Sequence, residues 1–276
     1  MRRERVSENV YWFQSELYAH VTAGAIVGPQ WAVLIDTLMP METPLIRDYL
    51  ENELMVPVRY VVNTHHHADH SWGNHFFPNA TIIGHRTCRE LMLDKSASAL
   101  AEAGVDNPFF KDISIVPPQI TFKSGSIHLR VGKKQLQIFS TPGHSYDSIS
   151  VLLEEDRILF AGDSFMPLPF FVGGDFDVLF ETMSSFGEMS LENIIQGHGD
   201  IILRGEIEET IKDNLTYLKS VQKLAKMASR RKYPLDFLQE QDVENSGKSR
   251  VYLGGIAQEV HQRNLRWMLF NQEANP

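Results

Sequence analysis

The sequence predicts an α/β (α+β) protein in which two β-sheets pack face to face with helices on the outside. Three observations predict it. Short apolar runs bounded by turn residues recur in both halves of the chain, and segments with helical apolar spacing follow each group of runs. The 276 residues are 43% hydrophobic and 22% charged, which is ordinary for a globular protein. Because no linker-like break divides the chain, we expect one domain over residues 1–276, with a helical C-terminal extension from about residue 205.

The first half predicts five strands and two helices. Each strand is a short apolar or β-branched run that turn or breaker residues bound, and they are expected at residues 10–13, 20–27, 31–36, 56–62 and 81–84. Residues 45–54 have apolar side chains at helical spacing, with Thr43 as the expected N-cap and Pro44 at the first helical position. A second helix is expected at residues 85–103, ended by Gly104.

The second half repeats this strand-rich pattern. Strands are expected at residues 127–131, 135–140, 149–153, 157–161 and 193–196. The turns at 132–134 and 154–156 make the first four of them two hairpins. Residues 207–227 and 256–269 have apolar side chains at helical spacing and predict two helices. Residues 105–125 contain three prolines and predict an irregular loop that could serve as a lid.

Charge and cysteine content narrow the class of protein. With 26 Lys and Arg against 35 Asp and Glu, the net charge is −9, which repels phosphate backbones, so no nucleic-acid partner is expected. The single Cys88 excludes an internal disulfide and a cysteine-based zinc module. Without a secretory signal or an apolar run of about 20 residues, we expect no membrane association and a cytoplasmic location. The expected partner is a small-molecule substrate, and a homodimer is left open.

Four histidines lie within six residues, in the segment Asn63-Thr-His-His-His-Ala-Asp-His70. The segment begins just after a predicted strand, so its side chains can converge outside the end of the sheet. His65 and His67 face the same way in an extended segment, and a turn at Ala68 would direct Asp69 and His70 to a second centre. A solvated polar loop is the alternative interpretation of these four histidines.

Three more metal-capable side chains follow predicted strands, each beside a glycine that permits a tight loop: His144, Asp163 and His198. With the segment above they make seven candidate metal ligands: His65, His67, Asp69, His70, His144, Asp163 and His198. Seven ligands exceed what one tetrahedral ion takes but suit two ions if a carboxylate bridges them. Because a structural zinc site favours cysteine and is closed by four ligands, this set indicates a catalytic centre.

The ordered motifs THHHADH, TPGH, AGD and QGHGD resemble those of the metallo-β-lactamase superfamily, over about residues 10–205. The resemblance implies a four-layer αβ/βα sandwich of the metallo-β-lactamase fold with a dinuclear site at one edge. It implies that His65, His67 and His144 bind one ion, that Asp69, His70 and His198 bind the other, and that Asp163 bridges both.

The pattern looks most like the glyoxalase II and lactonase-type hydrolases. Two divalent ions, expected to be Zn²⁺ with Fe or Mn as alternatives, would hold a hydroxide that cleaves an ester, thioester or lactone, with Asp69 orienting it as the catalytic residue. The alternatives are a mononuclear iron oxygenase similar to the persulfide dioxygenases, and a phosphodiesterase or β-lactam hydrolase.

An apolar stretch follows Asp163 where glyoxalase II enzymes have a Gly- and Arg-containing segment. We expect Phe165, Phe170 and Phe171 to form a substrate-binding wall beside the ions, so that the preferred substrate has an apolar group near its carbonyl. The alternative is that these side chains pack under the C-terminal helices. Three arginines near the C-terminus either supply a site for a substrate anion or belong to a solvated helix face: Arg250, Arg263 and Arg266.

Overall fold

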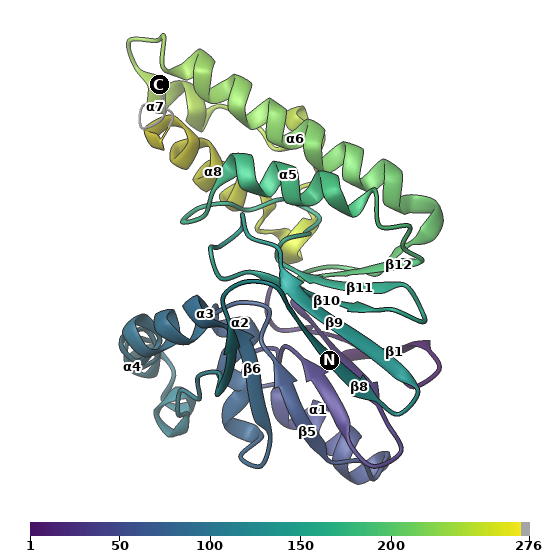
Figure 1. The fold of residues 1–276 in the computed structure, drawn as a ribbon. Helices are drawn as coiled ribbons and strands as arrows, with labels where there is room; N and C mark the ends of the chain where they lie inside the picture. Colours follow the sequence, from purple (N-terminus) through teal and green to yellow (C-terminus); the bar gives the residue numbers. More distant parts are fainter. Residues whose placement is uncertain (272–276) are drawn as a thin grey trace.

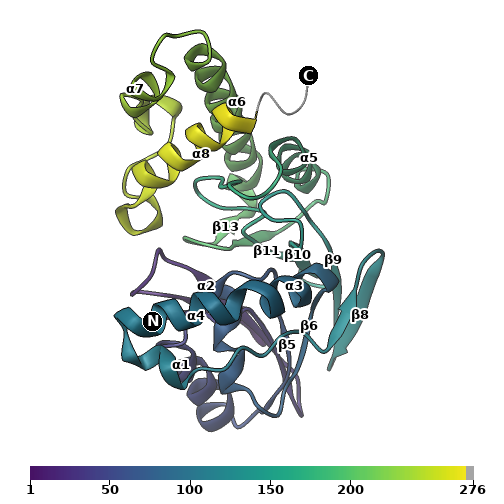
Figure 2. The ribbon, with the colours of Figure 1, turned by 90° about the vertical axis from the view of Figure 1, so that its left-hand side faces the viewer.

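The computed structural model describes residues 1–271, so the last five residues of the predicted domain lie outside the described residues. Two sheets face each other and helices cover the outer face of each, as Figures 1 and 2 show. This arrangement confirms the predicted mixed fold of two sheets between helices. Within the described residues, no helix is long and apolar enough to cross a membrane.

The first sheet has seven strands in the order β1-β2-β3-β4-β5-β6-β7. Their bounds are β1 Arg2–Ser7, β2 Val10–Gln14, β3 Thr22–Val27, β4 Ala32–Ile35, β5 Val58–Val62, β6 Thr81–His85 and β7 Ile120–Phe122. The first four strands pair antiparallel, and β4 to β7 pair parallel. The carboxyl ends of β4 and β5 therefore meet at one edge of the sheet.

The second sheet has six strands in the order β13-β12-β11-β10-β9-β8. Their bounds are β8 Ser126–Val131, β9 Lys134–Ser140, β10 Ile149–Leu153, β11 Ile158–Gly162, β12 Asn193–Gln196 and β13 Ile202–Leu203. The predicted hairpins are present, and β11 pairs parallel with β12. Alternate side chains of both sheets, such as Trp12, Ile138 and Phe160, fill the space between them.

Eight α-helices lie within the described residues: α1 Thr43–Asp48, α2 Ala68–Ser71, α3 Arg86–Leu91, α4 Ala97–Asp106, α5 Phe176–Phe186, α6 Ile207–Ala228, α7 Pro234–Gln239 and α8 Ala257–Asn271. A π-helical turn follows α1 at Tyr49–Glu53 and α3 at Met92–Ser96. Shorter 3₁₀ turns lie at Trp72–Phe76, Pro108–Asp112, Arg204–Glu206, Glu244–Ser246 and Tyr252–Gly255. In Figure 1, α5, α6 and α8 (green to yellow) cover the second sheet, and α1, α3 and α4 (blue) belong to the layer on the first.

Some elements differ from the prediction. The edge strand β1 was not expected because its side chains are polar and exposed, and only pairing with β2 defines it. Thr43 is not the N-cap of α1: it lies inside the helix, and its hydroxyl donates to the carbonyls of Thr37 and Met39. Helix α5 was missed, since Gly173 and Gly174 interrupt the apolar pattern just before it.

Residues 105–125 are more ordered than predicted. They include the end of α4, the 3₁₀ turn Pro108–Asp112 and the strand β7. They do not line the cavity at the histidine cluster described below, so the structure gives them no role as a lid over it.

Candidate metal centre

The first sheet brings the His65–His70 segment to the edge where β4 and β5 end. Ile35 of β4 is paired with Val62 of β5, so Asp36 lies beside the residues that follow β5. The short helix α2 begins at Ala68, with His67 as its N-cap. This helix supplies the turn that the sequence predicts, and it places the His70 ring 4.3 Å from that of His65, measured between ring centres.

The second sheet places Asp163 and His198 next to each other because β11 and β12 run parallel and end together. Gly162 is paired with Gln196. At Gly197, a Cβ atom would lie 1.9 Å from the Asp163 carboxylate oxygen Oδ1 and 2.7 Å from the carbonyl carbon of Gly162. Only glycine lets the two loops approach this closely. His144 arrives from the loop after β9.

All seven predicted ligands come together in two adjacent groups. His65, His67, His144 and Asp163 form one group, Asp69, His70 and His198 form the other, and within each group the potential ligand atoms lie within 4.8 Å of one another. Asp163 contacts both groups: its Oδ2 lies 3.4 Å from His144 Nε2 and 3.5 Å from His198 Nε2, and its Oδ1 lies 3.2 Å from His70 Nε2. Asp69 Oδ2 lies 3.5 Å from His198 Nε2. Asp163 therefore contacts histidines of both groups.

Hydrogen bonds outside the cluster orient its imidazoles. The Nδ1 atom of His144 lies 2.7 Å from the Phe170 carbonyl oxygen, and that of His198 lies 2.9 Å from the Ala19 carbonyl oxygen. Since a carbonyl only accepts, each Nδ1 carries a proton, and each Nε2 faces the cluster, where the neutral imidazole offers a lone pair. Such outer contacts are typical of histidines that bind metal ions.

Asp36, which the sequence analysis missed, orients a histidine of each group. Its Oδ2 accepts a hydrogen bond from His70 Nδ1 (2.8 Å) and one from the Thr64 hydroxyl (2.7 Å). Because the hydroxyl donates to Asp36, it accepts from His65 Nδ1, which lies 3.0 Å away. One feature of the sequence could have identified Asp36: it is an acidic residue directly after a buried strand, where a charged side chain needs a partner.

The electrostatics of the cluster favour a bound cation. Burial holds the pKa values of His65 and His67 well below the ordinary value, and that of His144 below it, so these imidazoles are neutral. Burial also opposes charge on His70 and His198, but the carboxylates, Asp163 foremost, outweigh it and raise both pKa values.

Asp163 itself stays ionised. Burial would raise its pKa, but the imidazoles of His70 and His198 outweigh that effect and hold the pKa well below its ordinary range. Neutral imidazoles and ionised carboxylates are the forms that bind divalent cations.

Two buried atoms without hydrogen-bond partners give a further reason to expect a metal ion in this cluster. Two buried polar atoms at the centre of the cluster, His70 Nε2 and Asp163 Oδ1, have no hydrogen-bond partner. Buried polar atoms rarely lack a partner without a reason, and a cation between the two groups would satisfy both atoms. A ligand set of imidazole and carboxylate suits zinc, iron or manganese.

A cavity of about 330 Å³ opens onto the cluster. His67, Asp69, His144, Asp163 and His198 form part of its wall, and the rest is Tyr18, Ala19, Ala68, Met166, Phe170, Val172, Leu253, Ile256, Val260 and Arg263. The cavity therefore combines the candidate metal ligands with a mostly apolar wall.

The structure places only one of the three expected phenylalanines at this cavity. Phe170 lines it, but Phe165 and Phe171 are fully buried in the core between the second sheet and the C-terminal helices. The expected wall of Phe165, Phe170 and Phe171 is therefore wrong for two of its members, since neighbouring residues of this segment point to opposite sides. Met166 and Val172 take their place.

Of three further residues that the sequence analysis considered or that adjoin the ligands, only one lies at the cavity. His66 points away from the cluster, toward the buried Asp147, whose Oδ1 is 3.0 Å from His66 Nδ1. Arg263 reaches the cavity from α8, with its guanidinium 4.8 Å from the centre of the Phe170 ring. Arg250, by contrast, pairs with Asp242 and Glu244 away from the cavity.

Several known proteins are similar to this chain in sequence. A beta-lactamase-like protein 2 homolog of Caenorhabditis elegans is 27% identical over 173 residues, which are 62% of this chain and 52% of that protein. The thioesterase pkgB of Emericella nidulans is 26% identical over 175 residues, 63% of this chain and 41% of that protein. The chain thus spans about half the length, or less, of these curated relatives.

A solved structure has the same fold over almost the whole chain. It is a metallo-beta-lactamase family protein from Thermus thermophilus, with a TM-score of 0.71 at 16% identity, covering 98% of this chain and 95% of that one. The family model of the metallo-beta-lactamase superfamily matches residues 19–233. Nothing in these likenesses selects the glyoxalase II or lactonase subtype, which stays a prediction. With its cluster of histidines and aspartates at the edge of two sheets, the chain belongs to the metallo-beta-lactamase superfamily of metallo-hydrolases.

Proposed function

We propose that this protein is a hydrolase with a dinuclear metal centre that cleaves a thioester or another activated ester, including a lactone. The observation that carries the proposal is the position of Asp163 between two groups of ligands, each with its imidazoles turned inward. We propose two divalent ions, Zn²⁺ first, with Fe or Mn as alternatives. One group would be His65, His67 and His144, the other Asp69, His70 and His198.

When bound, such ions activate water as a nucleophile near neutral pH and polarise a carbonyl group. The chain's own residues would do the rest. Asp69 lines the cavity, so its carboxylate can accept a hydrogen bond from a water molecule there and orient it toward a substrate carbonyl. Asp36, acting through His70 and through Thr64, would keep imidazoles of both groups in position.

The cavity wall supports a substrate with an apolar acyl group. Met166, Phe170 and Val172 from the segment after β11 face Ile256 and Val260 around α8, and a small polar substrate would leave this surface wet. A thioester is the favoured bond because one relative of this chain is named a thioesterase. Arg263 forms no ion pair with any described residue, so it can receive an anionic group of the substrate at the rim.

The test is metal analysis of protein purified without chelators, followed by activity on thioesters, lactones, phosphodiesters and β-lactams. We expect close to two ions per chain and highest kcat/KM for an apolar acyl thioester. One iron per chain with oxygen consumption would instead indicate an oxygenase. Highest activity on the phosphodiester or the β-lactam would reject the proposed substrate class while leaving the metal centre intact.

A further inference from the structure

The segment between β11 and α5 borders the metal centre, although residues 163–175 contain neither a helix nor a strand. Phe170 of this segment contributes twice to the site. Its ring lines the cavity, 5.8 Å from the His144 ring between centres, and its carbonyl oxygen lies 2.7 Å from His144 Nδ1. Pro167 and Pro169 have no N–H group to donate. Side chains from outside the segment must therefore fix its backbone.

Asn264 of α8 forms hydrogen bonds with the backbone on both sides of Phe170. Its Oδ1 accepts from the Phe171 N–H (3.4 Å), and its Nδ2 donates to the Pro169 carbonyl oxygen (2.7 Å). The same Nδ2 donates to the Tyr217 hydroxyl of α6, 3.1 Å away. Asn264 is fully buried, and since an N–H only donates and a carbonyl only accepts, its amide has one possible orientation.

A single peptide group connects Asn264 to the candidate ligand His144. The Phe170 carbonyl and the Phe171 N–H belong to the same planar unit, and because this unit is trans they point in opposite directions. The N–H donates to Asn264 at one end, and the carbonyl accepts from His144 Nδ1 at the other. A rotation of the peptide plane would lose both hydrogen bonds, so the Asn264 amide determines where the carbonyl points.

Helix α8 lies outside the part of the chain that the family model matches. The match ends at residue 233, whereas α8 is Ala257–Asn271. Nevertheless α8 contacts Phe170 in two ways, through its neighbouring peptide groups by Asn264 and through its ring by Arg263, whose guanidinium lies 4.8 Å from the ring centre. The C-terminal helices thus reach the backbone that orients a candidate metal ligand.

We propose that Asn264 is a positioning residue of the metal centre, which acts through the Phe170–Phe171 peptide group to direct the His144 imidazole toward its ion. The inference rests on the proposed function, since it takes the group of His65, His67 and His144 to hold an ion. The other group has its own outer contacts, because the Ala19 carbonyl holds His198 and Asp36 holds His70. Loss of Asn264 should therefore weaken the binding of one ion and spare the other.

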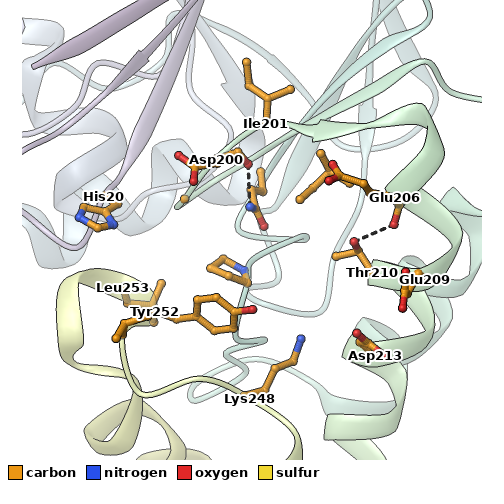
Figure 3. Close-up of a pocket in the computed structure, with 15 residues that line it drawn as sticks. His20, Asp200, Ile201, Glu206, Glu209, Thr210, Asp213, Lys248, Tyr252 and Leu253 are labelled. Atoms are coloured by element: carbon orange, nitrogen blue, oxygen red, sulfur yellow. Dashed lines mark hydrogen bonds between the residues drawn. The ribbon is translucent and has the colours of Figure 1, made fainter.

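Asn214 of α6 provides a matched control. It is also fully buried, and its Nδ2 donates to the Met166 carbonyl oxygen of the same segment at 3.0 Å. Its Oδ1 accepts from Lys248, whose side chain Figure 3 shows reaching into a neighbouring cavity of about 510 Å³. Among the described residues, the Met166 carbonyl accepts from Asn214 and from no candidate metal ligand. Removing Asn214 disturbs the same segment without a direct path to His144.

The test is competition of the zinc-loaded protein with a chelator, followed through the release of each ion. His144→Gln identifies the release step that belongs to its group. In Asn264→Leu, which has a side chain of similar size but no amide, that step should show an affinity about tenfold lower, and the other step should not change. Asn214→Leu leaves Lys248 without its acceptor, so it should lower the free energy of unfolding at least as much yet keep both affinities.

Unchanged affinities in Asn264→Leu would overturn the proposal, as would an equal loss in Asn214→Leu. If Asn264→Leu does not fold, Asn264→Ala, which leaves room for water, takes its place in the same comparison. A second measurement needs no metal: in nitrogen NMR spectra of the metal-free protein, the His144 Nδ1–H signal should shift or disappear in the Asn264 variant and stay in Asn214→Leu. A parent protein that binds no zinc would contradict the proposed function, and this signal would then decide whether Asn264 orients His144.

Discussion

The two sheets contribute to the metal centre in different ways. The first sheet supplies four of the seven candidate ligands from one segment of six residues, oriented by the adjacent Asp36. The second sheet supplies His144, Asp163 and His198 from three separate loops. The first contribution is set by local sequence, whereas the second depends on the topology that makes three strands end at one edge.

This difference indicates which substitutions should disrupt the metal centre most. Within the first segment, each side chain has a neighbour in sequence that keeps it near the cluster. Asp163 has no such neighbour, yet it is the residue that contacts histidines of both groups. The predictions below test whether the centre depends on the second sheet for its bridge and on the first for its orientation.

The largest effect is expected for Asp163→Ala. Because this carboxylate contacts both groups, its removal should lower the metal content from the proposed two ions per chain to below one. His66→Ala changes a histidine inside the first segment that faces Asp147 instead of the cluster, so it should keep its ions. Metal analysis after identical purification decides the matter, and equal losses in the two variants would contradict the bridging role.

A smaller effect is expected for Asp36→Asn. The amide oxygen can still accept from His70 and the Thr64 hydroxyl, but the NH2 group then faces the Thr64 backbone N–H, which donates to the other oxygen of the carboxylate. Metal affinity should therefore fall about 10- to 100-fold. Asp147→Asn provides the control, since Asp147 is equally buried but faces His66. Competition with a chelator measures the affinity. If Asp147→Asn weakens binding as much, Asp36 acts through stability alone.

The success of the sequence analysis also differs between the contiguous segment and the separate loops. The His65–His70 segment could be interpreted because its ligands are contiguous, and the loops of His144, Asp163 and His198 could be found because each follows a predicted strand. Asp36 was missed since a single acidic residue after a strand has no spacing pattern. The orientation of Phe165 and Phe171 could not be predicted, because an irregular segment has no periodicity that assigns its side chains to the cavity or to the core.

The segment after β11 gives a prediction of intermediate size. Phe170→Ala should raise KM for long-chain acyl substrates about threefold to tenfold, because the substrate loses apolar contact equivalent to roughly one buried methylene group. The KM for short-chain substrates should stay almost unchanged. Phe171→Ala, one residue on, removes a core side chain and should lower the free energy of unfolding by about 3–5 kcal/mol without changing chain-length preference. Steady-state kinetics and denaturant titrations separate the two. If Phe170→Ala leaves the chain-length preference unchanged, Phe170 does not contact the acyl chain of the substrate.

The last prediction concerns the helices that hold this segment. His261 of α8 is buried, its Nδ1 lies 3.0 Å from the Tyr217 hydroxyl, and Asn264 connects that hydroxyl to the Pro169 carbonyl oxygen beside Phe170. Burial lowers the pKa of His261 from 6.5 to about 4, so below pH 6.5 the unfolded chain takes up a proton that the folded chain refuses. The stability that this residue contributes is present above pH 6.5 and is lost as the pH falls toward 4, by up to about 3 kcal/mol. In His261→Gln, the free energy of unfolding of metal-free protein should therefore fall less between pH 7 and pH 4.5 than in the parent, whereas the exposed His128→Gln should follow the parent. If His261→Gln and the parent lose the same stability over this range, the histidine is already protonated in the folded state, and its contact with Tyr217 must be that of a donor.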